Sequence, residues 1–147
     1  MVRRGENVWP PARIVVGDDF SEDARKAAEL AANLGKLFGA RMLLLHAVPR
    51  LPQASSEAVE AKLEDRAGEL EDILQQRPQT RTVAGDPAEV LIEGAQEGEE
   101  PTLVAVGSRG LGLVGRLRLG SVSTKVVRAG LGAVLVYPPL GDGRLRT

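Results

Sequence analysis

The sequence predicts an α/β protein in which five parallel strands form one sheet with helices on both faces. Short apolar runs typical of buried strands alternate along the chain with amphipathic stretches typical of helices. Glycine and proline mark most of the changes between the two. Repeated strand–helix–strand units form right-handed crossovers, which place the strands parallel and bury both faces of the sheet. A chain of 147 residues is long enough for one such domain and its core.

The first half of the chain supplies two strands and two helices. Residues 13–17 are a β-branched run, and residues 42–48 are a second apolar run that ends at a proline. Between them we expect a helix with alanines at helical spacing and Gly39 at its end. Asp19, with Glu22 three residues later, resembles a capping box at the start of this helix.

A second amphipathic helix follows a polar loop predicted over residues 49–56. Its apolar positions are Val59, Leu63, Ala67, Leu70 and Leu74. The other face is strongly charged, and such a face is most simply exposed to solvent. The charged residues are Glu57, Glu60, Lys62, Glu64, Asp65, Arg66, Glu69, Glu71 and Asp72.

The second half supplies three strands and two helices. They are a strand over 80–84, a helix from 87 to about 96, a strand over 103–107, a helix over 121–129 and a strand over 133–137. Alternation in the first of these strands indicates the edge of a sheet. Asp86 is the expected N-cap of the helix that follows it, with Pro87 at the first helical position.

The domain is expected within residues 12–140, after an extended lead-in over 1–11 and before a disordered tail over 141–147. No apolar run approaches the roughly 18 residues of a membrane span, and no signal-peptide core follows the N-terminus. The chain contains no cysteine, which excludes disulfides, thiolate chemistry and cysteine-based zinc sites. We therefore expect a cytoplasmic protein without membrane contact.

Charge is unevenly distributed along the chain although the net charge is −1. Residues 1–100 contain 19 acidic and 12 basic residues, whereas residues 101–141 contain five basic residues and no acidic one. Such a segment suits a polyanionic ligand, and it is also typical of a mostly buried segment. Aromatic residues make up only 3% of the chain and no basic stripe carries stacking residues, so nucleic acid is not an expected partner.

The strongest functional pattern lies inside this acid-free segment and reads Gly107-x2-Gly110-x9-Gly120-Ser121. It follows a predicted strand and opens a predicted helix. Glycine lets a ligand approach the backbone closely, and a helix N-terminus offers unpaired N–H groups to an anion. Nucleotide phosphate binding is favoured over the alternative, a tight glycine-rich turn. The motif has neither a Walker A lysine nor the acid of a dinucleotide fingerprint, so the usual machinery for fast hydrolysis is missing.

Two acidic residues and one histidine are further candidates at the ligand-facing ends of the strands. The Asp19 carboxylate can accept hydrogen bonds from a ribose or an adenine amine, or cap the next helix, and the two roles can coexist. Asp18 is expected to be solvated. His46, which ends the second strand, is more typical of a packed, hydrogen-bonded residue than of a catalyst. The residues predict no catalytic set, and no metal other than Mg²⁺ held through the phosphates of a nucleotide.

The last strand, over residues 133–137, predicts self-association. As an edge strand it would expose unpaired backbone groups and apolar side chains. Pairing with its own copy in a second subunit would remove that exposure, so we expect a twofold homodimer.

The chain resembles the universal stress protein family from residue 14 to residue 138. Residues 15–21 resemble the opening strand and acidic turn of the family, residues 44–48 its second strand, and residues 85–89 the start of its third helix. Residues 106–136 resemble the ATP-binding version of its C-terminal signature, and this segment is the specific one. The resemblance implies an open sheet in the order 3-2-1-4-5, similar to the adenine nucleotide alpha-hydrolase fold, and dimerisation through the last strand.

The resemblance also implies an adenine nucleotide, ATP or AMP, between the first and fourth strands. On this basis Asp19 faces the ribose and adenine, and the backbone at Ala47 reads the adenine edge. Val106 and Gly107 flank the sugar. The phosphates are held by Gly110, Gly120, Ser121, Val122 and Ser123. Arg109 is counted with these residues, although its position varies within the family.

The implied function is a stress-response or signalling role in which ATP changes conformation or partner binding. Ordering of residues 111–119 on nucleotide binding would be the switch. Two alternatives remain open. One is a slow ATPase at the same site, with Asp19 or His46 as the general base. The other is a dimeric interaction module that holds no nucleotide.

Overall fold

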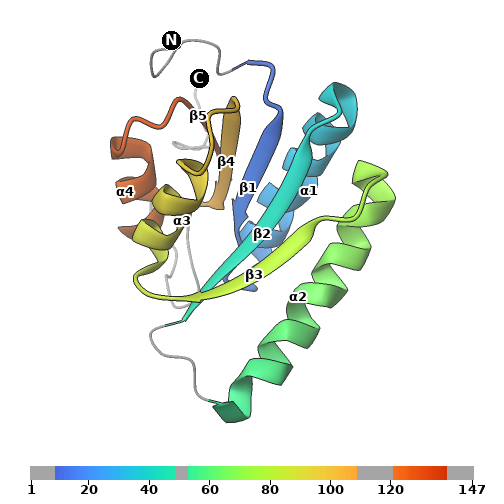
Figure 1. Ribbon diagram of the computed structural model, residues 1–147, viewed down its shortest axis with the longest axis vertical. Coiled ribbons are helices and arrows are strands. Elements are labelled where there is room, and N and C mark those ends of the chain that lie inside the picture. Colours follow the sequence, from blue (N-terminus) through green and yellow to red (C-terminus); the bar gives the residue numbers. More distant parts are fainter. Residues whose placement is uncertain (1–8, 49–52, 109–120, 139–147) are drawn as a thin grey trace.

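Five parallel strands pair in the order β3-β2-β1-β4-β5 between two layers of helices (Figure 1). The computed structural model describes residues 9–48, 53–108 and 121–138. The elements are β1 (Arg13–Gly17), α1 (Glu22–Phe38), β2 (Arg41–Val48), α2 (Gln53–Leu74), β3 (Gln79–Ala84), α3 (Pro87–Ala95), β4 (Thr102–Gly107), α4 (Ser121–Arg128) and β5 (Ala133–Tyr137). The predicted elements and the strand order are confirmed.

The start of α2 differs most from the sequence prediction. The polar loop expected through residue 56 ends earlier, because α2 already begins at Gln53. Serine lowers helix propensity only slightly, so polar residues alone do not keep a segment out of a helix.

Each face of the sheet has its own apolar core, because alternate residues of a strand point to opposite sides. The core under α1 and α2 includes Ile14, Val16, Leu44, Ala105, Leu63 and Leu70. The core under α3 and α4 includes Val15, Leu45, Val104, Val106, Leu91 and Val126. Successive residues of an inner strand therefore pack in turn under α1 and α2 and under α3 and α4.

Small residues bring α1 close to the sheet. Its buried residues are Ala24, Ala27, Ala28, Ala31, Ala32 and Gly35. A Cβ at Gly35 would lie 2.6 Å from the Cδ1 atom of Leu74, so α2 packs tightly there as well. The helix ends at Gly39, which has a φ of 71° as the C-cap prediction requires.

The N-terminal end of the described chain is attached to α1 and the core. Pro11 is fully buried, and the Trp9 ring meets the Phe38 ring edge-on with 5.2 Å between their centroids. None of the helices in the described ranges is long and apolar enough to cross a membrane.

Strand order reverses between β1 and β4, and this arrangement positions the site. β1 pairs with β2 on one side and with β4 on the other. After β1 the chain builds β2 and β3 toward one edge, then crosses back to form β4 and β5. The loops that leave β1 and β4 therefore diverge and leave a crevice at the carboxyl ends of these strands.

Candidate functional site

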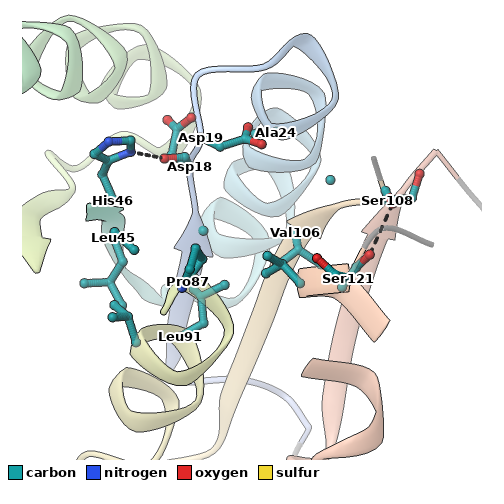
Figure 2. Close-up of a pocket in the computed structure, with 16 residues that line it drawn as sticks. Asp18, Asp19, Ala24, Leu45, His46, Pro87, Leu91, Val106, Ser108 and Ser121 are labelled. Carbon is teal, nitrogen blue, oxygen red and sulfur yellow. Dashed lines mark hydrogen bonds between the residues drawn. The ribbon is translucent and has the colours of Figure 1, made fainter. Parts of the chain in front are cut away.

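A cavity of about 450 Å³ lies at this point of strand reversal. It is bordered by the carboxyl ends of β1, β2 and β4 and by the first turns of α1, α3 and α4. The lining residues are Gly17, Asp18, Asp19, Ala24, Leu45, His46, Ala47, Pro87, Val90, Leu91, Val106, Gly107, Ser108, Ser121, Val122 and Ser123. Figure 2 shows the acidic turn, which contains Asp18 and Asp19, and His46 on one side, and Ser108 and Ser121 on the other.

One wall of the cavity is apolar and forms where α3 packs on the strands. Leu91 lies close to β1, and a Cβ at Gly17 would come within 2.5 Å of the Leu91 side chain. Leu45, Ala47 and Val90 also line the cavity and pack with Leu91 in one apolar cluster. A flat apolar ligand group is suited to this wall, because burying it removes apolar surface from water.

The opposite wall is polar and includes the start of α4. The Ser123 hydroxyl donates a hydrogen bond to the carbonyl of Ser108 over 3.2 Å, which joins the first turn of α4 to the end of β4. The first turn of α4 contains no acidic residue. Unpaired N–H groups and the helix dipole make such a start favourable for an anion.

Gly107 is needed for packing at this wall. A Cβ there would lie 2.9 Å from the backbone nitrogen of Ala24 and 3.0 Å from the Cβ atom of Asp23. The end of β4 can therefore approach the start of α1 only without a side chain. The glycine in the motif thus has a structural role in addition to any contact with a ligand.

The acidic turn differs from the sequence prediction in two respects. Ser21, not Asp19, is the N-cap of α1, since its hydroxyl accepts the Ala24 N–H over 3.1 Å. Asp19 instead accepts the Ser21 N–H over 2.9 Å. A capping side chain must stand one residue before the helix, and α1 begins at Glu22. The capping box expected from Asp19 and Glu22 is therefore wrong.

Asp18 was expected to be solvated, and this is also wrong. Its side chain is completely buried. One carboxylate oxygen accepts the Phe20 N–H over 2.9 Å, and the other lies 3.2 Å from Nη1 of Arg66. Burial raises the pKa of Asp18, and Arg66 opposes that rise. The Asp18 N–H continues the β1–β2 ladder by donating to the Leu45 carbonyl over 2.9 Å, and the side chain lies against Arg66 of α2.

Arg66 is the partner that sequence reasoning missed. It was grouped with the solvated face of α2, yet its side chain is only 10% exposed. A signal was present, because Arg66 lies three residues after Leu63 and four before Leu70, on the apolar face of the helix. A lone cation on such a face needs a buried partner.

His46 is packed and hydrogen-bonded, as expected. Its Nδ1 atom lies 2.7 Å from the Asp18 carbonyl oxygen. A carbonyl can only accept, so Nδ1 carries the proton and donates it to this bond. The ring also stacks on Phe20, with centroids 4.4 Å apart.

The structure brings most of the sequence-predicted site residues to the cavity. Those that line it are Asp19, Ala47, Val106, Gly107, Ser121, Val122 and Ser123. Arg109, Gly110 and Gly120 lie outside the described residues. The contribution of α3, through Pro87, Val90 and Leu91, was not predicted, because its reach across to β1 depends on packing between layers. Within the described ranges, no group of three or more His, Asp or Glu residues could hold a metal ion.

The fold and the place of the cavity define a doubly wound α/β protein with a cavity at its switch point, where proteins of this class bind ligands. The sequence model of the universal stress protein family matches residues 11–138. The chain is also 35% identical, over 123 residues, to a universal stress protein of Thermus aquaticus encoded 3′ of a QAH/OAS sulfhydrylase; the match covers 78% of this chain and 89% of that protein. The protein described here belongs to the universal stress protein family.

Solved structures share the fold. The hypothetical protein MJ0577, whose structure was used to assign a biochemical function, is 26% identical with a TM-score of 0.75, over 84% of this chain and 93% of that one. A universal stress protein crystallised in complex with cAMP is 31% identical with a TM-score of 0.67, over 86% and 95% of the two chains.

Proposed function

We propose that this protein binds an adenine nucleotide, ATP or AMP, in the cavity and signals through it rather than by fast catalysis. The observation that carries the proposal is the cavity at the switch point, with an apolar wall on α3 and the start of α4 opposite. Its volume of about 450 Å³ lies within the range usual for small-molecule sites. The cAMP complex of a 31% identical family member supports the class of ligand.

The adenine would lie against the apolar wall, with the backbone at Ala47 reading its edge. Asp19, the exposed acid of the turn, would face the ribose. The phosphates would lie toward Ser121, Val122 and Ser123 at the start of α4, where N–H groups and the helix dipole favour negative charge. Any Mg²⁺ would be held through the phosphates.

A second copy of the chain would pair with β5. This strand forms one edge of the sheet, and β4 is its only partner strand within the described chain. Every residue of β5 is partly exposed. Antiparallel pairing about a twofold axis would satisfy the free edge and cover these side chains.

The test begins with freshly purified protein, which is denatured so that any released nucleotide can be identified by mass spectrometry. Titration calorimetry of the emptied protein with ATP, AMP and cAMP then ranks the ligands. Ala47→Phe should fill the apolar wall and abolish binding. Val48→Phe is the matched control, because adjacent residues of a strand point to opposite faces of the sheet.

Bound nucleotide would also stabilise the fold by about 2.7 kcal/mol at a concentration 100 times Kd. Wild-type protein that releases no nucleotide, gives no heat with any of the three ligands and shows no thermal shift would rule out the proposed function. Retained binding in Ala47→Phe would place the nucleotide elsewhere.

A further inference from the structure

A buried ion pair joins α2 to the wall of the cavity. Arg66 comes from α2 and does not line the cavity, whereas its partner Asp18 does. Nη1 of Arg66 and Oδ2 of Asp18 are both buried and 3.2 Å apart, and neither makes a hydrogen bond with the described residues. Charge attraction therefore links them.

Asp18 holds together several groups of the cavity wall. Its carboxylate accepts the N–H of Phe20, a residue with a φ of 66° that a non-glycine rarely adopts. Its carbonyl fixes the tautomer of His46, and Phe20 stacks on the same imidazole ring. Asp19 is the next residue in the turn. A change in the charge state of Asp18 therefore acts on three neighbours at once.

Anchoring α2 does not require this pair. Leu63, Ala67, Leu70 and Leu74 of α2 are all at most 3% exposed in the core. Arg77, beyond the end of α2, bonds to Glu64 and Glu71 on its outer face. Buried ion pairs add little net stability compared with apolar residues of the same size.

Electrostatics give the pair a second consequence at the site. Asp18 and Asp19 are adjacent acids of the turn at the cavity, the first with a buried side chain and the second exposed. A buried anion without a partner would repel the phosphates of a nucleotide, since interactions in a buried site are weakly screened. The Arg66 guanidinium offsets one of the two charges without entering the cavity.

We infer that Arg66 is a positioning residue for the ligand: by neutralising Asp18 it holds the turn of Asp18, Asp19 and Phe20 and the His46 ring in their binding arrangement. The inference rests on the proposed nucleotide function of the cavity. It assigns a part in setting nucleotide affinity to α2, which contributes none of the described residues that line the cavity.

The charged and titratable groups around Asp18 come from three elements. Arg66 faces it from α2, where Lys62 lies 5.3 Å from the centroid of the Phe20 ring. Asp19 adjoins it in the turn, and His46 faces it from β2. Burial raises the pKa of Asp18, and Arg66 is the strongest influence that lowers it. Without Arg66 the carboxyl would titrate at higher pH.

The test measures ATP affinity by calorimetry from mildly acidic to mildly alkaline pH, with each value expressed relative to wild type at the same pH. Arg66→Met should weaken binding about tenfold on the alkaline side, and the loss should shrink as Asp18 gains a proton on acidification. Arg66→Gln removes the charge but keeps a polar group, and it serves as a second variant with the same expected profile if Arg66→Met does not fold.

Two controls separate positioning from general stabilisation. Asp18→Asn combined with Arg66→Met removes both charges, and should bind ATP more tightly than Arg66→Met alone and without its pH dependence. Arg77→Met removes a cation that also contacts α2, but far from the cavity, and should bind ATP as wild type does. Circular dichroism at the working temperature shows that each variant is folded.

The outcomes distinguish this inference from the proposed function. If wild type binds no nucleotide, both fail. If wild type binds ATP and Arg66→Met binds equally well, or loses affinity equally at all pH values, only the inference about Arg66 is overturned. A double variant that binds ATP as weakly as Arg66→Met, with the same pH dependence, also overturns it, since the anion would then not be the cause.

Discussion

Two arginines of similar burial lie at opposite ends of β1, and their partners differ. Arg13 is at its amino end, and Arg66 contacts the residue that follows its carboxyl end. Arg13, 12% exposed, donates to the Gly94 carbonyl over 2.8 Å and to the Glu97 carbonyl over 3.3 Å, at the end of α3. Arg66, 10% exposed, faces one buried carboxylate at the cavity. The first arginine satisfies neutral groups of the backbone, whereas the second compensates a charge.

This difference separates a structural role from a functional one. A cation near the last carbonyls of a helix satisfies acceptors that have no partner in the helix and complements its dipole. Removing Arg13 therefore leaves the two backbone carbonyls without this donor, but it leaves no buried charge. Removing Arg66 leaves an anion inside the protein, beside the proposed ligand, which is the more costly defect.

The largest effect on stability is expected for Arg66→Met. Breaking a buried pair by removing one partner should lower the free energy of unfolding at neutral pH by about 3 kcal/mol. Burial raises the pKa of Asp18 above its ordinary value of 3.8, so the folded protein binds this proton more tightly than the unfolded chain. The contribution of this carboxyl to stability then decreases as pH rises through its folded-state pKa.

Because Arg66 lowers the pKa of Asp18, removing Arg66 raises that pKa. The decrease in stability with rising pH then continues to higher pH. The deficit of Arg66→Met relative to wild type should therefore grow from acidic to neutral pH in urea titrations. A deficit that is constant across this range would show that the pair is not coupled to the protonation of Asp18.

A smaller effect is expected for Arg13→Met. Loss of hydrogen bonds from a charged donor to the end of α3 should lower the free energy of unfolding by about 2 kcal/mol. The loss should not depend on pH near neutrality, and ATP affinity should equal that of wild type. Urea titration and calorimetry of one preparation check both. Weakened ATP binding would mean that α3 transmits changes from its C-terminal end to the cavity.

The smallest effect is expected for Glu97→Gln, which removes the acidic partner of Arg13. The two side chains are 3.6 Å apart, but Glu97 is 50% exposed and also contacts Arg81. Exposed ion pairs contribute little, so the change in unfolding free energy should be at most about 0.5 kcal/mol. A loss comparable to that of Arg13→Met would show that charge pairing, not the backbone carbonyls, holds Arg13.

Much of the fold could be predicted because its signals are local. Asp86 and Pro87 marked the start of α3, and the Asp86 side chain accepts the Glu89 N–H over 3.2 Å as an N-cap should. Gly39 marked the end of α1. Strand order came from the family resemblance rather than from any single residue. It agrees with the observed pairing.

The acidic turn could not be predicted in the same way. Sequence alone treated Asp18 as solvated, because an acid next to a turn is usually exposed. Its burial depends on where α2 packs, and α2 is separated from it in the sequence by the whole of α1 and β2. The contribution of Leu91 likewise depends on the close approach of α3 to Gly17.

The sequence by itself determined the alternation of strands and helices, the ends of α1 and α3, and the presence of a glycine-rich motif after β4. These follow from hydrophobic periodicity and backbone preferences, which act over a few residues. Tertiary structure alone decided that Asp18 is buried, that Arg66 neutralises it, and that Gly107 makes room for α1. Burial and charge pairing depend on which surfaces meet, and that is known only once the helices have packed on the sheet.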